Sequence, residues 1–197
     1  MDVVGCRARN YRVMLRTSVL NALALGAIGP LMIVFIEGLS GSIGAFATAI
    51  GLFGIANGAA SFFAGRLSDR FGRKLFIVAG GFIQSGAFVC YTLVDSISQL
   101  YLLQIVLGVN SAMMFTARDA FMADITEMAT RGRQLGNVDA ATGIVAALAT
   151  IAGGQLVEYM GFAIVFYAVA AALFISNLVR WRSLNEKQLR NEQASYS

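Results

Sequence analysis

The chain of 197 residues contains no histidine, one proline and two cysteines. Without histidine it has no imidazole that could bind a metal or relay a proton. Cys6 lies in an arginine-rich amino end and Cys90 lies inside an apolar run, so the two cysteines do not suggest a disulfide. No group of residues has the spacing of metal ligands. We therefore expect neither a metal site nor a cofactor.

Charge is also scarce. Charged residues make up 13% of the chain and hydrophobic residues 57%, whereas a soluble domain has about 25% charged residues. This composition indicates an integral membrane protein surrounded by lipid. The net charge of +4 does not indicate a nucleic-acid partner, because the basic residues flank apolar runs and do not form a separate patch.

Six apolar runs each approach the roughly twenty residues that a helix needs to cross a bilayer. They cover about residues 17–36, 43–64, 75–94, 100–121, 138–157 and 162–179. The sequence predicts an all-α membrane protein with an amino end over 1–16, a six-helix transmembrane domain over 17–182 and a tail over 183–197. A signal peptide is the alternative for the first run, but that run is long and no small-residue cleavage site closes it. Gly29-Pro30 marks a place where this first helix can bend.

The basic residues predict the orientation of the chain. With six crossings, all fifteen Lys and Arg residues fall on one side of the membrane or at its edge. The loops on the other side contain only Glu37, Asp95 and Glu158 as charged residues. By the positive-inside rule, both termini are expected in the cytoplasm, with the chain in a plasma membrane or a bacterial inner membrane.

A charged segment, Gly65-Arg66-Leu67-Ser68-Asp69-Arg70-Phe71-Gly72-Arg73-Lys74, joins the second and third runs. We expect a short loop in which Gly65 lets another backbone approach, Asp69 caps the next helix or pairs with a cation, and Gly72 permits a tight turn. Any cytoplasmic loop would carry basic residues, but that does not explain the order Gly-x-Leu-x-Asp-Arg-x-Gly-Arg-Lys. This order resembles the loop 2–3 signature of the major facilitator superfamily of transporters. The matching positions are Gly65, Leu67, Asp69, Arg70, Gly72, Arg73 and Lys74.

The resemblance covers about residues 12–182 and concerns only the amino-terminal half of the family's fold. Members usually have two six-helix halves, each expected to be a 3+3 inverted repeat, and they rock around a substrate held between the halves. The resemblance implies a half-size transporter of an unidentified small solute, completed by a second copy of itself or by a separate complementary half. The alternative is a non-transporting membrane subunit within a larger membrane complex. An enzyme is not expected, because no nucleophile–base pair and no phosphate-binding loop is present.

Three departures from the family weaken the interpretation as a proton-driven drug antiporter. Gln104 stands four residues before Gly108, where many family members have Arg. Ala149-Thr150 occupies the place of the Gly-Pro pair that drug antiporters of the family carry late in helix 5. The first helix also has no acidic residue within its span.

The end of the fourth run is a second charged stretch that resembles the family. It contains Arg118, Asp119, Asp124 and Arg131. Ionisable groups near the end of an apolar helix usually face a partner or a cavity, although they can also snorkel to the interface. For Asp119 the choice between structural pairing and a substrate or proton role stays open. Arg118 cannot lose its charge, so it is the first candidate for contacting an anion or for locking a conformation.

Polar residues within the apolar runs either bond neighbouring helices or line a cavity, and the sequence does not separate these two roles. Residues of this kind include Asn57, Gln84 and Thr142. The residues that we assign to a candidate substrate cavity are Asn21, Gln104, Asn110 and Arg118.

Small residues in membrane helices predict close helix packing. The candidates are Gly51, Gly54 and Gly58 in the second run and Gly143, Gly153 and Gly154 in the fifth. In a homodimer, helix 2 of one copy would face helix 5 of the other, because the two halves of a complete family member are related by a pseudo-two-fold axis. Asp69 would then approach Arg131 and Arg133 of the second copy.

Overall fold

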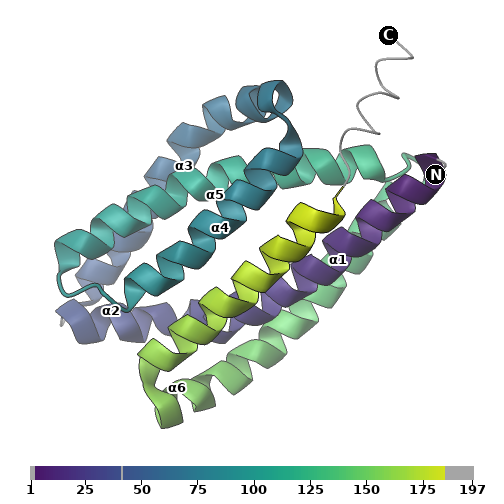
Figure 1. Ribbon diagram of the computed structural model, residues 1–197. Helices are drawn as coiled ribbons and strands as arrows, with labels where there is room; N and C mark the ends of the chain where they lie inside the picture. Colours follow the sequence, from purple (N-terminus) through teal and green to yellow (C-terminus); the bar gives the residue numbers. More distant parts are fainter. Residues whose placement is uncertain (1–2, 41, 185–197) are drawn as a thin grey trace.

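The structure is a computed structural model that describes residues 3–40 and 42–184, all of which lie in helices or short connections. The helices are α1 (Val3–Ile28), the 3-10 helix η1 (Gly29–Leu31), α2 (Met32–Ser40), α3 (Ile43–Phe71), α4 (Arg73–Tyr91), α5 (Ile97–Ile125) and α6 (Arg131–Ser183). They form one elongated bundle, with the start of α1 and the end of α6 at the same end (Figure 1). Most of the expected tail lies outside the described residues.

Five helical segments of the described chain are long and apolar enough to cross a membrane. They are Gly5–Leu39, Ile43–Phe71, Arg73–Tyr91, Ile97–Ile125 and Arg131–Ser183. The first of them joins α1, η1 and α2, and its helix changes to a 3-10 turn at the expected Gly29-Pro30 position.

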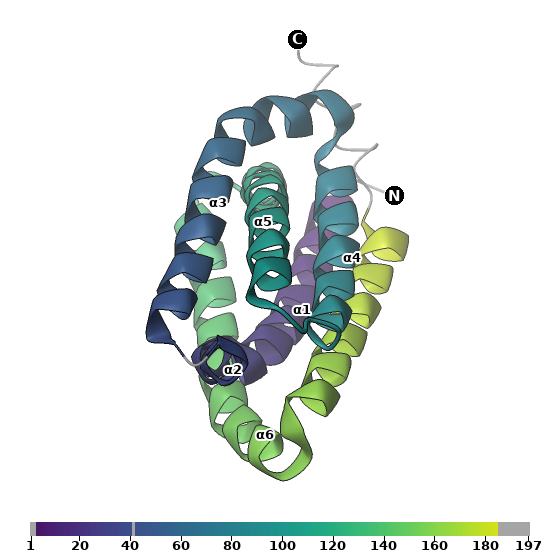
Figure 2. The same ribbon diagram turned by 90° about the vertical axis from the view of Figure 1, so that its left-hand side faces the viewer.

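Helix α6 has 53 residues, and a straight α-helix of that length would extend for about 80 Å. The hydrocarbon core of a membrane is only about 30 Å thick. At Gly161 the backbone leaves the helical conformation, with φ 76° and ψ 167°. There α6 turns back on itself, so its two parts run in opposite directions (Figure 2).

The bundle is held by contacts of α1 with α6, of α3 with α5, and of α4 with both α5 and α6. In Figure 2, α5 lies between α3 and α4. One apolar cluster, toward α2, contains the packed rings of Phe35, Tyr91 and Phe166. A second cluster, nearer the chain ends, includes Met14 and Phe121. Large apolar side chains also cover the outside, as expected for helices that face lipid.

The described part of the predicted amino end, residues 1–16, is helical and packs against the bundle. Helix α1 begins at Val3, and Cys6, Asn10 and Met14 are buried in the bundle. The hydroxyl of Tyr11 donates a hydrogen bond to the carbonyl oxygen of Gln134 (3.0 Å), which ties this end to α6.

The glycine faces differ from our packing prediction. Within the described chain, a Cβ atom added to Gly51, Gly54, Gly58, Gly143 or Gly154 would meet no atom within 4 Å. For these glycines, the expectation of close packing is wrong inside the chain and stands only for contact with another molecule. The sixth glycine, Gly153, does pack tightly, against the backbone of Ala27. Other close contacts lie at glycines that the sequence did not single out, namely Gly26, Gly80, Gly81 and Gly108.

Candidate functional site

The charged signature segment is helical for most of its length, which corrects the prediction of a loop. Helix α3 continues through Asp69 to Phe71, and Gly72 alone separates it from α4, with φ 99°. Asp69 therefore does not cap the next helix, and the residue before α4 makes no side-chain cap. A Cβ atom on Gly65 would meet only Thr116 Cγ2 at 4.0 Å, so no backbone approaches closely there.

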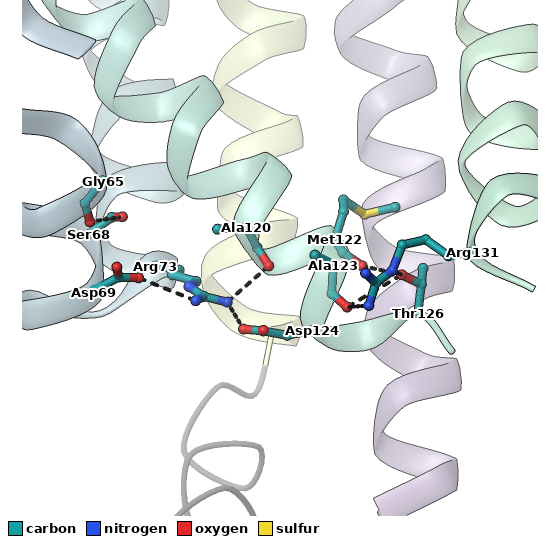
Figure 3. Close-up of polar contacts among 10 residues, drawn as sticks. All are labelled: Gly65, Ser68, Asp69, Arg73, Ala120, Met122, Ala123, Asp124, Thr126 and Arg131. Atoms are coloured by element: carbon teal, nitrogen blue, oxygen red, sulfur yellow. Dashed lines mark hydrogen bonds and ion pairs between the residues drawn. The ribbon is translucent and has the colours of Figure 1, made fainter. Parts of the chain in front are cut away.

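Arg73 connects three helix ends (Figure 3). From the start of α4, its Nη2 donates to Asp69 Oδ1 in α3 (3.2 Å) and its Nη1 donates to the carbonyl oxygen of Ala120 in α5 (2.9 Å). Nη1 also forms an ion pair with Asp124 near the end of α5. The guanidinium thus joins residues of both charged stretches that the sequence singled out. The side chain of Asp69 remains 64% exposed.

Two further basic residues satisfy backbone carbonyl groups at helix ends, where intrahelical partners are lacking. Lys74 Nζ donates to the Leu184 carbonyl oxygen at the end of α6 (2.6 Å). Arg131 donates to Thr126 Oγ1 (3.2 Å) and to the Ala123 carbonyl oxygen (2.7 Å), both at the end of α5 (Figure 3). Arg131 is therefore already engaged within its own chain. Of the two remaining signature residues, Leu67 is half-buried and Arg70 is exposed, with its guanidinium 5.5 Å from the ring centre of Phe71.

A cavity of about 160 Å³ lies between α1, α4, α5 and α6. Its polar lining consists of Ser18, Asn21, Gln84, Arg118, Thr142 and Arg180. Asn21 and Arg118 are thus brought together on this wall, and Gln84 and Thr142 join them. The Oε1 atom of Gln84 is buried and accepts no hydrogen bond from the described residues.

The other two predicted cavity residues, Gln104 and Asn110, are buried in α5 but do not line this cavity. Asn110 Nδ2 donates to the carbonyl oxygen of Gly80 in α4 (3.0 Å). Asn57 Nδ2 likewise donates to the carbonyl oxygen of Gly108, from α3 to α5 (3.3 Å). These two asparagines bond neighbouring helices.

Arg180 is the most buried cation of the cavity, with 2% of its surface exposed. Its Nε donates to Thr17 Oγ1 (2.9 Å) and its Nη1 donates to Asn177 Oδ1 (3.5 Å). The hydrogen-bond network orients the Asn21 amide so that its oxygen accepts from Arg180 Nη1 (3.1 Å) and its nitrogen donates to Ser176 Oγ (2.7 Å). All of these acceptors are neutral. Among the described residues, Arg180 has no carboxylate partner.

Arg118 lies in α5 at the wall of the same cavity and is about three-quarters buried. Its only ion pair within the described chain is to the adjacent Asp119, at 4.0 Å. The side chain of Asp119 is 76% exposed, and such exposed pairs contribute little. No Asp or Glu of the described residues lines the cavity. The cavity wall is therefore positively charged.

The comparison with protein families decides the family. A family model described as Major Facilitator Superfamily matches residues 15–195. The chain belongs to the Major Facilitator Superfamily. Together with helices of membrane-spanning length, this membership makes it an integral multi-pass membrane protein of a transporter family.

Individual superfamily relatives differ in how much of their length the chain covers. It is 28% identical to the uncharacterized MFS-type transporter YitZ of Bacillus subtilis over 160 residues, which are 81% of this chain and 98% of that protein. It is 36% identical to Multidrug resistance protein 2 of Bacillus subtilis over 77% of this chain and 38% of that protein. It is 35% identical to Multidrug resistance protein MdtG of Dickeya zeae over 65% of this chain and 31% of that protein. The chain thus spans less than half the length of both multidrug resistance proteins.

The superfamily signature does not include Arg180, and the positive-inside rule places this residue among the basic residues at the cytoplasmic edge. A local signal was present in the sequence. Asn21 follows Thr17 by four residues, and Arg180 follows Ser176 by four residues, so each pair lies on one face of its helix. Two such polar faces in otherwise apolar helices indicate a buried polar contact between them.

Proposed function

We propose that this chain is one half of a solute transporter that works by alternating access. The observation that carries the proposal is the cavity of about 160 Å³. Arg118 and Arg180, with Asn21 and Gln84, place polar groups inside an otherwise apolar bundle. Polar and ionisable groups inside a membrane are costly and mark solute pathways. In superfamily members the substrate lies between two halves, so this cavity would form one wall of the pathway.

We further propose that the chain crosses the membrane six times. The reversal of α6 at Gly161 supports counting α6 as two crossings, because each part is long enough to span the hydrocarbon core. The placement of Lys and Arg supports cytoplasmic termini in a plasma membrane or bacterial inner membrane. The start of α1 and the end of α6 lie at the same end of the bundle, as this topology requires (Figure 1).

A second copy of the chain is the partner that the surface supports. The glycines Gly51, Gly54 and Gly58 on α3, and Gly143 and Gly154 on α6, leave open space on the outside of the single chain. In an isologous dimer, α3 of one copy would pack against the first part of α6 of the other. The exposed Asp69 would then face Arg133 of the second copy, because Arg131 is held within its own chain. The near-complete coverage of YitZ supports a unit of this size.

The names of the multidrug resistance relatives suggest drug export as the whole activity. The positively charged cavity and the absence of an acid from its described lining do not favour cationic drugs. The alternative is a non-transporting membrane subunit, in which the open glycine faces of α3 and α6 would dock another protein.

The test combines native mass with uptake. The chain is extracted from its own membrane in a mild detergent, weighed by native mass spectrometry and reconstituted into lipid vesicles. Uptake of radiolabelled phosphate, succinate and ethidium is then measured under proton and sodium gradients, with empty vesicles as the control. A dimer with saturable uptake of one of these probes is expected. A chain found only within a larger assembly, without uptake of any probe, would instead support the structural subunit.

A further inference from the structure

The chemistry of the cavity wall points to one class of ligand. Arg118 from α5 and Arg180 from α6 line the same space, and their like charges repel each other across it. Neither is neutralised by a buried carboxylate of the described chain. Asp119 is the one acid of the described residues that pairs with Arg118; its Oδ1 lies 4.0 Å from Arg118 Nη1, and its side chain is mostly exposed. A cation entering this space would meet two positive charges, whereas an anion would relieve the repulsion between them.

The surroundings of Arg180 hold its guanidinium in place without cancelling its charge. Thr17, Asn21 and Asn177 accept hydrogen bonds from it, and all three are neutral. Asn177 is fixed in turn by donating to the carbonyl oxygen of Leu173 (2.7 Å). A buried arginine held in this way is a preorganised donor for a carboxylate or phosphate group.

Gln84 supplies a third polar group, from α4, on the cavity wall. Its Oε1 atom is buried and lacks a hydrogen-bond partner among the described residues, and an unpaired buried polar atom is costly. Rotation of the terminal amide exchanges its oxygen and nitrogen atoms, so Gln84 can present a donor to a ligand. The cavity volume of about 160 Å³ equals the share of roughly five waters in the liquid. This is sufficient for a phosphate or a short dicarboxylate.

We propose that the cavity between α1, α4, α5 and α6 binds a small anion through Arg118 and Arg180, with Gln84 as an additional hydrogen-bonding group. The anionic group is a carboxylate or a phosphate, carried by a soluble solute or by a lipid headgroup. Transport of this anion by the chain rests on the proposed transport function. Binding of the anion in the cavity does not depend on that function.

Binding is measured on the full chain in a neutral detergent by isothermal titration calorimetry and by thermal unfolding. The probes are inorganic phosphate and succinate, with ethidium as a cationic control. Phosphate or succinate is expected to bind and to raise the unfolding temperature, and ethidium is not expected to bind at this site. Arg118→Gln should weaken anion binding about ten- to a hundredfold, because it removes a charge-assisted donor. Arg182→Gln is the matched control. Arg182 lies within one helical turn of Arg180, but it is exposed and does not line the cavity.

A second measurement, in lipid, distinguishes the two sources of the anion, namely a soluble solute and a lipid headgroup. The chain is placed in nanodiscs of phosphatidylcholine or of phosphatidylglycerol. If phosphatidylglycerol stabilises the chain in an Arg118-dependent manner while phosphate and succinate do not bind, the anion is a lipid headgroup. Should Arg118→Gln fail to fold, Arg118→Lys, which keeps the charge, and Gln84→Leu, which removes only the amide, take its place. Each should weaken anion binding several-fold.

The proposal is overturned if no anionic probe or lipid stabilises the chain, or if Arg118→Gln and Arg182→Gln have equal effects. The result is independent of the uptake test. Anion binding without uptake would overturn transport and leave the site intact. Uptake of ethidium without anion binding would overturn the anion site and leave transport intact.

Discussion

Arg73 is the residue at which the ends of α3, α4 and α5 meet. Among the described residues, its carboxylate partners differ in exposure: the side chain of Asp69 is 64% exposed and that of Asp124 is 24% exposed. Exposed ion pairs contribute about 0.2–1 kcal/mol, whereas hydrogen bonds to charged groups contribute about 1.5–3 kcal/mol. The contact with Asp124 should therefore stabilise the fold more than the contact with Asp69. Asp69 is left available for interactions outside the chain.

We predict that Arg73→Gln lowers the free energy of unfolding by about 1.5–3 kcal/mol. The change removes the donor to Ala120 and leaves Asp124 without this cation. Asp69→Asn should cost less than about 1 kcal/mol. Unfolding by sodium dodecyl sulfate in mixed micelles, followed by circular dichroism, measures both. Arg70→Gln is the control, because Arg70 is exposed in the same segment. Equal losses for Arg73→Gln and Arg70→Gln would contradict this account.

The sequence predicted Arg118 as a cavity residue, but it did not predict Arg180. Arg118 interrupts an apolar run, and the cost of a charge in lipid makes such a residue conspicuous. Arg180 follows the last apolar run and is close in sequence to Arg182, so the charge pattern groups it with the basic cytoplasmic edge. Burial of Arg180 depends on Thr17 and Asn21, more than 150 residues away in α1. Such a long-range partnership is invisible to hydropathy.

At the scale of elements, the contact between α1 and α6 joins the two ends of the chain. Gly26 and Gly153 allow the helices to approach, and a Cβ atom on Gly26 would lie 2.6 Å from the carbonyl oxygen of Ala146. The hydroxyl of Thr150 donates to the carbonyl oxygen of Gly26 (2.9 Å) across the same contact. This contact also brings Arg180 of α6 next to Thr17 of α1.

The neighbouring glycines Gly153 and Gly154 provide a test of this contact. Gly153→Ala should destabilise the chain by about 1–3 kcal/mol, because the added methyl group would meet the backbone of Ala27. Gly154→Ala should be neutral or stabilising by up to about 1 kcal/mol, since its surroundings within the described chain are open and Ala favours helix. Thermal unfolding in detergent compares the two. If both substitutions had the same effect, α1 would not lie against Gly153.

Gly153 and Gly154 show that an apolar pattern predicts the positions of helices but not their rotation. Runs of hydrophobic residues predicted where each helix lies and the interruption at Gly161, because a bilayer dictates the length of an apolar run. They did not predict that α1 and α3 extend beyond their runs into charged segments. Gly153 and Gly154 are equivalent in hydropathy, but they lie about 100° apart around the helix. Which of them meets α1 depends on the rotation of α6, and that rotation follows from packing with residues distant in sequence.

At the scale of the whole molecule, the outer face of α3 has no neighbour within the described chain. Gly51, Gly54 and Gly58 share this face with Ile55 and Phe62, which are 73% and 82% exposed. Small residues flanked by large apolar ones allow close approach of a second helix, and they also tolerate lipid. The dimer proposal requires that another chain covers this face.

We predict that Gly54→Leu converts the proposed dimer to a monomer and leaves the stability of the single chain within about 0.5 kcal/mol of the unsubstituted chain. The added side chain enters open space in the chain itself, but it would separate α3 from a partner helix. Gly86→Leu on α4 is the matched control, because a Cβ there also meets no described atom within 4 Å and this face is not part of the proposed interface. Native mass spectrometry reads the oligomeric state, and uptake into vesicles reads the consequence. Loss of both the dimer and uptake in Gly54→Leu, but not in Gly86→Leu, would support a pathway built by two copies, because a single half has no opposing wall. A monomer that retained uptake would remove the need for a second copy.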